Sequence, residues 1–147
     1  MTTPQDGCHL PVQVHFDDLD AMGLLHNSRY TLLVERAISA YWAELGWNFD
    51  PSVSAFQDVF MAVREFKITF HAPIVGACEP VVHFWMERLG RTSGVYGFRV
   101  LSSDGSVVHA EGHRVNVNLD PATFRPTPFS PETRQAAGLL LREPVAS

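Results

Sequence analysis

One long amphipathic helix followed by four successive strand patterns constrains the fold of this 147-residue chain more than any other feature. Between Asn27 and Gly46 apolar residues recur at helical spacing, which predicts a helix of about 18 residues, or about 27 Å. Residues 59–119 instead alternate with a period of two, and short turns separate the runs, which favours antiparallel neighbours. The apolar helix positions are Tyr30, Leu33, Val34, Ala37, Ile38, Tyr41 and Leu45.

These patterns predict an α+β architecture, with one long central helix wrapped by a curved five-stranded antiparallel sheet and a short C-terminal helix. A change of parity near Arg64 predicts a β-bulge, and Asp104-Gly105 predicts a hairpin turn. Several strands are apolar on both faces, so either the sheet curls tightly round the helix or a second subunit covers the rest. The expected strands are 11–16, 60–70, 80–89, 92–102 and 107–119.

The domain organisation is expected to be a single unit over residues 1–147, because no internal repeat or low-complexity segment divides the chain. Residues 1–10 are expected to form an N-terminal arm, 11–119 the core, and 120–147 a proline-rich tail. Within the tail, Ser130-Pro131 predicts the start of the short helix. Asn27 or Ser28 is expected to cap the long helix.

The composition excludes several classes of protein. Hydrophobic residues make up 46% of the chain and charged residues 18%, which is typical of a globular protein and not of a disordered one. The net charge is −5 without a basic run, so nucleic acid is not an expected partner. No apolar run approaches the ~18 residues of a membrane span, and the first residues lack a secretory signal pattern. A cytoplasmic location is therefore expected.

Three carboxylates follow the first predicted strand, at Asp17, Asp18 and Asp20. They could bind Ca²⁺ or Mg²⁺, although the oxygen-rich loop pattern with its distal glutamate is missing. They could equally form a solvated turn that favours the dipole of the following helix. No metal is predicted here.

Asp20 has a sharper interpretation, because its loop must fold back toward the helix start near Ser28. Free N–H groups at a helix N-terminus can hold the oxyanion of a tetrahedral intermediate. Asp20 could then act as a general base on water, or as a nucleophile that forms an acyl anhydride.

Other candidate residues allow more than one interpretation. His26 could bind substrate or orient the next residue, or be a partly exposed loop histidine. Glu35 could face the site as a second carboxylate or be a surface charge. No Gly-x-Ser-x-Gly elbow is present, and Cys78 has no evident histidine partner. His109 and His113 would lie about 13 Å apart along a strand, too far for one zinc ion.

The segment from Val14 to Gly23, the Asn27–Tyr30 run and the long helix resemble the 4-hydroxybenzoyl-CoA thioesterase branch of the hotdog-fold superfamily. The order of elements over residues 11–120 also fits. The resemblance implies hydrolysis of the thioester bond of an acyl-CoA. It implies that Asp20, the last aspartate of an Asp-x-Asp-x-x-Gly motif, is the catalytic carboxylate. It further implies that an N–H near Asn27 polarises the thioester carbonyl.

The resemblance also implies where coenzyme A and a second subunit lie. The family's CoA arm often passes the start of the fourth strand, here the stretch from Arg88 to Ser93. The active site typically lies between subunits, so a homodimer or homotetramer is expected. No cofactor is expected apart from the CoA of the substrate. The implied substrate-binding residues are Gly23, His26, Asn27, Ser28, Arg88, Arg91 and Ser93.

Two departures from the family and three alternatives remain. Leu24-Leu25-His26-Asn27 stands where many relatives have His-Val-Asn-Asn, and Gly76-Ala77 stands where many have Gly-Asp.

A hotdog dehydratase of 3-hydroxyacyl thioesters is one alternative, although its Asp-x-Asn-Pro-x-His loop is absent. A non-catalytic acyl-thioester binding protein and a carrier-protein-linked editing thioesterase are the others; the acidic chain would suit an acidic carrier poorly. The sequence does not name the acyl group.

Overall fold

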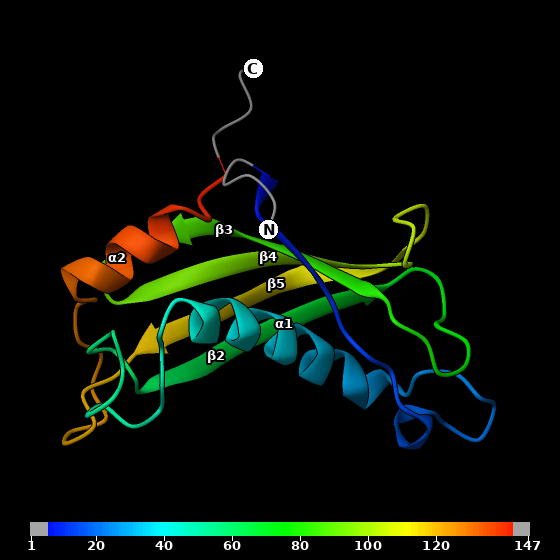
Figure 1. Cartoon of the computed structure of the whole chain (residues 1–147), viewed down its shortest axis with the longest axis horizontal. Helices are drawn as coiled ribbons and strands as arrows, with labels where there is room; N and C mark the ends of the chain where they lie inside the picture. Colours follow the sequence, from blue (N-terminus) through cyan, green and yellow to red (C-terminus); the bar gives the residue numbers. More distant parts are fainter. Residues whose placement is uncertain (1–5, 143–147) are drawn as a thin grey trace.

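The computed structural model describes residues 6–142, in which a long helix lies along one curved antiparallel sheet (Figure 1). The sheet has five strands in the order β1-β3-β4-β5-β2. The predicted α+β architecture is therefore confirmed. The strands are β1 (Cys8–Pro11), β2 (Met61–Phe70), β3 (Val81–Leu89), β4 (Ser93–Leu101) and β5 (Val108–Asn118). The helices are α1 (Tyr30–Glu44) and α2 (Pro131–Gly138), with 3₁₀ turns η2 (Phe16–Asp18) and η3 (Asn27–Arg29).

Two local predictions about the sheet are confirmed. The register between β2 and β5 shifts between Val63 and Glu65, which places a bulge at Arg64. In the turn between β4 and β5, Gly105 has a φ of 78°, a conformation that glycine adopts without steric cost. The last four strands consequently form a continuous antiparallel arrangement with β2 at one edge.

The first strand lies earlier than predicted. Residues Cys8–Pro11 pair with β3, whereas Val14 makes only an isolated bridge with Cys78. Phe16, expected to continue the strand, is 86% exposed. The cause is Asp18, whose carboxylate accepts the N–H of His15 at 2.8 Å and starts the 3₁₀ turn η2 there. Part of the expected N-terminal arm therefore belongs to the sheet.

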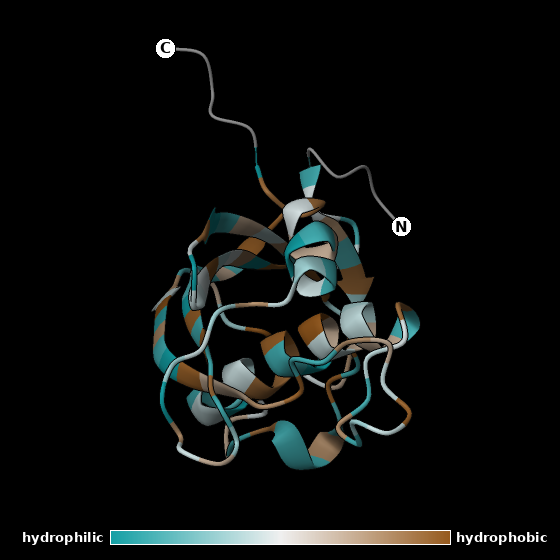
Figure 2. Ribbon diagram, turned by 90° about the vertical axis from the view of Figure 1, so that its left-hand side faces the viewer, coloured by the Kyte–Doolittle hydropathy of each residue, from teal (hydrophilic) through white to brown (hydrophobic). Residues whose placement is uncertain are grey.

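The long helix also begins differently from the prediction. The 3₁₀ turn η3 precedes α1, and His26 caps that turn by accepting the N–H of Ser28 at 3.1 Å. Neither Asn27 nor Ser28 is the N-cap, because both lie inside the turn. Seen roughly along α1, the sheet curves around the helix (Figure 2). The buried face of α1 comprises Tyr30, Leu33, Val34, Ala37, Ile38 and Tyr41.

The outer face of β3 is covered by the two ends of the described chain. The ring of His9 stacks on that of His83, with centroids 3.9 Å apart. Further along the same face, the guanidinium of Arg142 lies 3.8 Å from the ring centroid of Trp85. This cover explains why β3 is apolar on both faces. Within residues 6–142, no helix combines the length and the apolar character needed to cross a membrane.

The proline-rich tail is attached to the sheet through Asp58, in the segment before β2. Its carboxylate accepts the N–H and O–H of Ser130 at 2.7 and 2.8 Å and the amide of Asn118 at 3.1 Å. Burial raises the pKa of Asp58, but hydrogen bonds from Thr133, Ser130 and Asn118 outweigh it, so the pKa lies below its ordinary value. Ser130 is the N-cap of α2, so Asp58 fixes the start of that helix.

We expect Asp58→Asn to destabilise the protein at neutral pH but not in acid. Because folding lowers the pKa of Asp58, its ionised form stabilises the fold above the ordinary value of 3.8, and this contribution disappears as the pH falls through the lower folded value. The loss at pH 7 should be about 1–2 kcal/mol, or about 2–8 °C in Tm. Thermal denaturation from pH 3 to 8 measures it, with Asp17→Asn, an exposed carboxylate, as the control. A difference that persists unchanged at pH 3 would contradict this role.

Candidate functional site

The carboxylates of the acidic loop have different surroundings. Asp18 is buried, accepts the N–H of His15 and lies 3.8 Å from the guanidinium of Arg29. Its carbonyl also accepts the N–H of His26 at 3.0 Å. Asp18 therefore fixes the loop against the start of the helix. Asp17 is exposed, and the acidic loop is not a cluster of converging metal-ligating atoms among residues 6–142.

Asp20 is held in place by one of its two carboxylate oxygens. Its Oδ1 accepts the N–H of Met22 at 2.8 Å and that of Leu24 at 3.1 Å. The backbone closes the same loop, because the N–H of Gly23 donates to the carbonyl of Asp20 and Gly23 has a φ of 77°. Within the described part of the chain, Oδ2 has no hydrogen-bond partner. The loop thus orients the carboxylate and leaves one oxygen available.

A cavity of about 300 Å³ lies beside Asp20 at the N-terminal end of α1. Asn27, the first residue of η3, lines it together with Tyr30, so Asp20 and the helix start share one cavity. The opposite wall comes from the end of β2 and the following loop, including Phe70 and His71. This is the arrangement that a carboxylate acting next to an oxyanion site requires.

The other residues predicted near the helix start do not line this cavity. His26 is exposed, and its Nδ1 lies 2.8 Å from the hydroxyl of Ser28 as well as accepting that residue's N–H. Both side chains are thus engaged in capping the turn. Gly23 allows the turn of the Asp20 loop through its positive φ, but it does not line the cavity.

Arg88, Arg91 and Ser93 lie far from Asp20 within one chain. They surround the turn between β3 and β4, at the end of the sheet where α1 finishes (Figure 1). Both arginines are exposed. One protomer therefore does not bring this group and Asp20 together.

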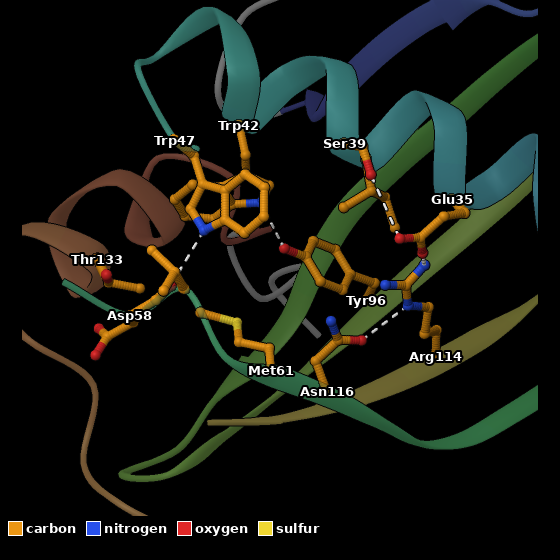
Figure 3. A pocket seen from close by; sticks show the side chains of 12 residues that line it. Glu35, Ser39, Trp42, Trp47, Asp58, Met61, Tyr96, Arg114, Asn116 and Thr133 are labelled. Atoms are coloured by element: carbon orange, nitrogen blue, oxygen red, sulfur yellow. Dashed lines mark hydrogen bonds and ion pairs between the residues drawn. The ribbon is translucent and has the colours of Figure 1, made fainter. Parts of the chain in front are cut away.

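A second cavity, of about 160 Å³, lies between the C-terminal half of α1 and the sheet (Figure 3). Arg114 on β5 is buried there, donates to the carboxylate of Glu35 and donates through Nε to Asn116 at 2.8 Å. On β4, the hydroxyl of Tyr96 accepts the indole N–H of Trp42 at 2.8 Å. Glu35 consequently belongs to this cavity and not to the one beside Asp20.

Sequence reasoning singled out Glu35 but missed its partner Arg114 and the neighbouring Tyr96 and Asn116 of the second cavity. One signal could have found them, because Arg114, Asn116 and Asn118 alternate along β5 and so share one face of the strand. Polar side chains on a face directed at a helix call for partners or for a ligand.

One group of possible metal ligands occurs in residues 6–142, where single atoms of Asp6, His9 and His83 lie within 4.8 Å of one another. The two imidazole rings are nearly parallel, with planes 8° apart. A metal ion binds in the plane of an imidazole, and two stacked rings have no common plane. This geometry is that of a ring stack rather than of a coordination site.

Comparisons with known proteins identify the family and related folds. The family model described as the thioesterase superfamily matches residues 22–109, which is more than half of the chain. No curated protein matches the chain.

Several solved structures share the fold. A protein from Pseudomonas aeruginosa strain PAO1 has a TM-score of 0.81 at 21% identity, with 96% of each chain covered. A proposed thioesterase from Pseudomonas aeruginosa has a TM-score of 0.75 at 26% identity, covering 87% of this chain and 95% of the other. A thioesterase from Thermus thermophilus, in complex with coenzyme A and Zn, has a TM-score of 0.72 at 24% identity, with 88% and 95% covered.

Proposed function

Because this chain belongs to the thioesterase superfamily, with its hotdog fold, we propose that it hydrolyses acyl-CoA thioesters with Asp20 as the catalytic carboxylate. One observation carries the proposal. The carboxylate of Asp20 is fixed by two backbone N–H groups through Oδ1, while Oδ2 faces no protein partner in the described chain and a cavity lies beside it at the start of the helix. The Asp-x-Asp-x-x-Gly motif supports the 4-hydroxybenzoyl-CoA thioesterase branch as part of the same proposal.

The proposed reaction follows one of two routes with the same products. As a base, Asp20 takes a proton from water while the hydroxide adds to the thioester carbonyl; as a nucleophile, it adds to that carbon itself. In both routes a backbone N–H near Asn27 holds the oxyanion. Collapse expels the CoA thiolate, which is protonated to the free thiol. The base route gives the acid directly, whereas the nucleophilic route gives an anhydride that water then hydrolyses.

We propose that a second copy of the chain completes the site. Among residues 6–142, strand β2 lies at the edge of the sheet with β5 as its one neighbour, and it exposes Val63. An unpaired edge of this length is a template for another strand. Met61 at one end of β2 lines the second cavity, and Phe70 at the other end lines the cavity beside Asp20.

Antiparallel pairing of two β2 strands about a twofold axis would place the Phe70 end of one beside the Met61 end of the other. The Asp20 cavity of one protomer would then adjoin the second cavity of its partner. The Arg88–Ser93 turn lies at that same end, which supports its proposed role in binding the phosphates of CoA. Light scattering should give a mass of two or four chains, and a monomer at micromolar concentration would contradict this assembly.

A panel of CoA esters tests the reaction, with short and long, aliphatic and aromatic acyl groups. Release of free thiol is expected for some of them, and absorbance assays should find no enoyl-CoA. Tight binding of acyl-CoA without thiol release would instead indicate a binding protein. Formation of enoyl-CoA from 3-hydroxyacyl esters would indicate a dehydratase.

A further inference from the structure

The wall of the Asp20 cavity contains a histidine for which the proposed reaction has so far no use. Within residues 6–142, the titratable side chains of this wall are Asp20, Tyr30 and His71. Burial raises the pKa of Tyr30, against a hydrogen bond with the backbone of Ile74, so its hydroxyl keeps its proton at neutral pH. An imidazole instead exchanges a proton readily near neutral pH. His71 is therefore the group that, besides Asp20, can move a proton in this cavity.

The backbone fixes His71 at the point where β2 ends. Its N–H donates to the carbonyl of His109 on β5 at 2.8 Å, and the N–H of Ala72 donates to the same oxygen at 3.1 Å. In return, Nδ1 of His109 lies 3.0 Å from the carbonyl oxygen of Ala72. These contacts hold His71 in the wall that faces the start of the helix across the cavity.

The carboxylate of Glu111 orients the ring of His71. Its Oε1 lies 3.6 Å from Nε2 of His71, and its Oε2 lies 3.9 Å from Nε of Arg99 on β4. The carboxylate is thus placed between an imidazole and a guanidinium. Nδ1 of His71 has no hydrogen-bond partner among residues 6–142. A carboxylate at one ring nitrogen, with the other nitrogen left available, is how histidines that act as acids and bases are oriented.

The proposed reaction needs a proton at the sulfur. When the C–S bond breaks, the sulfur leaves with the electron pair, and an alkyl thiolate such as that of CoA is a basic leaving group. In the nucleophilic route Asp20 carries the acyl group at that moment and has no proton to give. In the base route the proton on Asp20 lies on the side of the attacking water. A second proton donor therefore assists either route.

We propose that His71 is a catalytic residue, the general acid that protonates the departing sulfur, and that Glu111 is its positioning residue. The inference rests on the proposed thioesterase function. In the nucleophilic route the imidazolium gives its proton to the sulfur, and the neutral ring then takes a proton from the water that hydrolyses the anhydride. In the base route it gives the same proton and regains one from Asp20, which took it from water. Both routes end with the acid, the thiol and the enzyme in its starting protonation state.

The experiment varies the leaving group at a constant acyl group, taken from the best CoA ester. The CoA ester is compared with the thioesters of N-acetylcysteamine, an alkyl thiol, and of para-nitrothiophenol, whose anion leaves without a proton. His71→Gln should lower kcat/KM about 10-fold or more for the two alkyl thioesters and less than about 2-fold for the nitrothiophenyl ester. The ratio kcat/KM is the quantity measured, because it covers the steps up to release of the thiol in both routes.

His113→Gln is the matched control. His113 also pairs with a glutamate, Glu65, between β5 and β2, but it does not line the Asp20 cavity. This variant should keep the wild-type kcat/KM for all three esters. Because His71 is exposed, His71→Gln should fold with the wild-type Tm.

Glu111→Gln tests the positioning role and carries the test of His71 if His71→Gln does not fold. It should show the same dependence on the leaving group with a smaller loss, about 3-fold for the alkyl thioesters, as expected for one weak hydrogen bond. A merely structural role of Glu111 would lower kcat/KM equally for all three esters.

The outcomes separate the two proposals. An equal loss for all three esters in His71→Gln, or no loss for the CoA ester, would overturn the role of His71 while leaving the thioesterase function intact. The same dependence on the leaving group in His113→Gln would overturn the assignment to this cavity. Absence of thiol release by the wild type from every CoA ester would refute the proposed function, and the inference would fail with it.

Discussion

Asp20→Asn should lower kcat for acyl-CoA hydrolysis at least about 100-fold, the low end of the loss expected when a general base is removed. Asparagine keeps an Oδ1 that can accept the N–H groups of Met22 and Leu24, so the loop should keep its shape. The variant removes the charge and the free carboxylate oxygen, and these are the two features that either proposed route needs. Thiol release under saturating substrate measures the effect.

The controls separate chemistry from loop structure. Asp20→Asn should keep the wild-type Tm, whereas Asp20→Ala should lose both activity and some stability, because two backbone N–H groups lose their acceptor. Asp17→Asn, three residues away and exposed, should keep full activity. If Asp20→Asn hydrolyses its best ester at nearly the wild-type rate, Asp20 is not the catalytic carboxylate.

Gly112→Ala should destabilise the fold by about 3 kcal/mol or more, at the upper end of single substitutions. A Cβ on Gly112 would lie 1.8 Å from the carbonyl oxygen of Lys67 and 3.0 Å from Cα of Ile68. Both atoms belong to β2, the neighbouring strand, and backbone atoms cannot rotate away as a side-chain end can. The β2–β5 ladder would have to separate at this point.

Urea denaturation of the variant measures this loss, and an unfolding midpoint equal to that of the wild type would contradict the close approach. Gly138→Ala is the matched control, since a Cβ there meets nothing within 4 Å. It lies at the end of α2, where alanine favours the helix, so a gain of up to about 1 kcal/mol is expected.

The periodic parts of the sequence predicted the fold well. The helix and the four later strands appear within a few residues of their expected bounds, because burial on one side imposes the same spacing on sequence and structure. The first strand was misplaced because Val12 and Val14 are buried without being paired in a strand, and burial alone produced the alternation.

The candidate site was only partly predictable. The motif located Asp20 beside Asn27 because both are close in sequence to the helix start. The contact between Glu35 and Arg114 joins residues 79 positions apart, and no local pattern encodes such a pair. His26 was ambiguous because its capping role depends on the 3₁₀ turn that replaces the first turn of the predicted helix.

The position of strand β2 between the two cavities limits which parts of this chain can change in length. Both cavities contact this one strand, at its opposite ends. The length of its ten residues, about 33 Å, therefore sets the distance between the two cavities. An insertion there would alter the spacing of both cavities at once, in every copy of an assembly. The hairpin around Gly105 touches neither cavity, so insertions should accumulate there while β2 keeps its length.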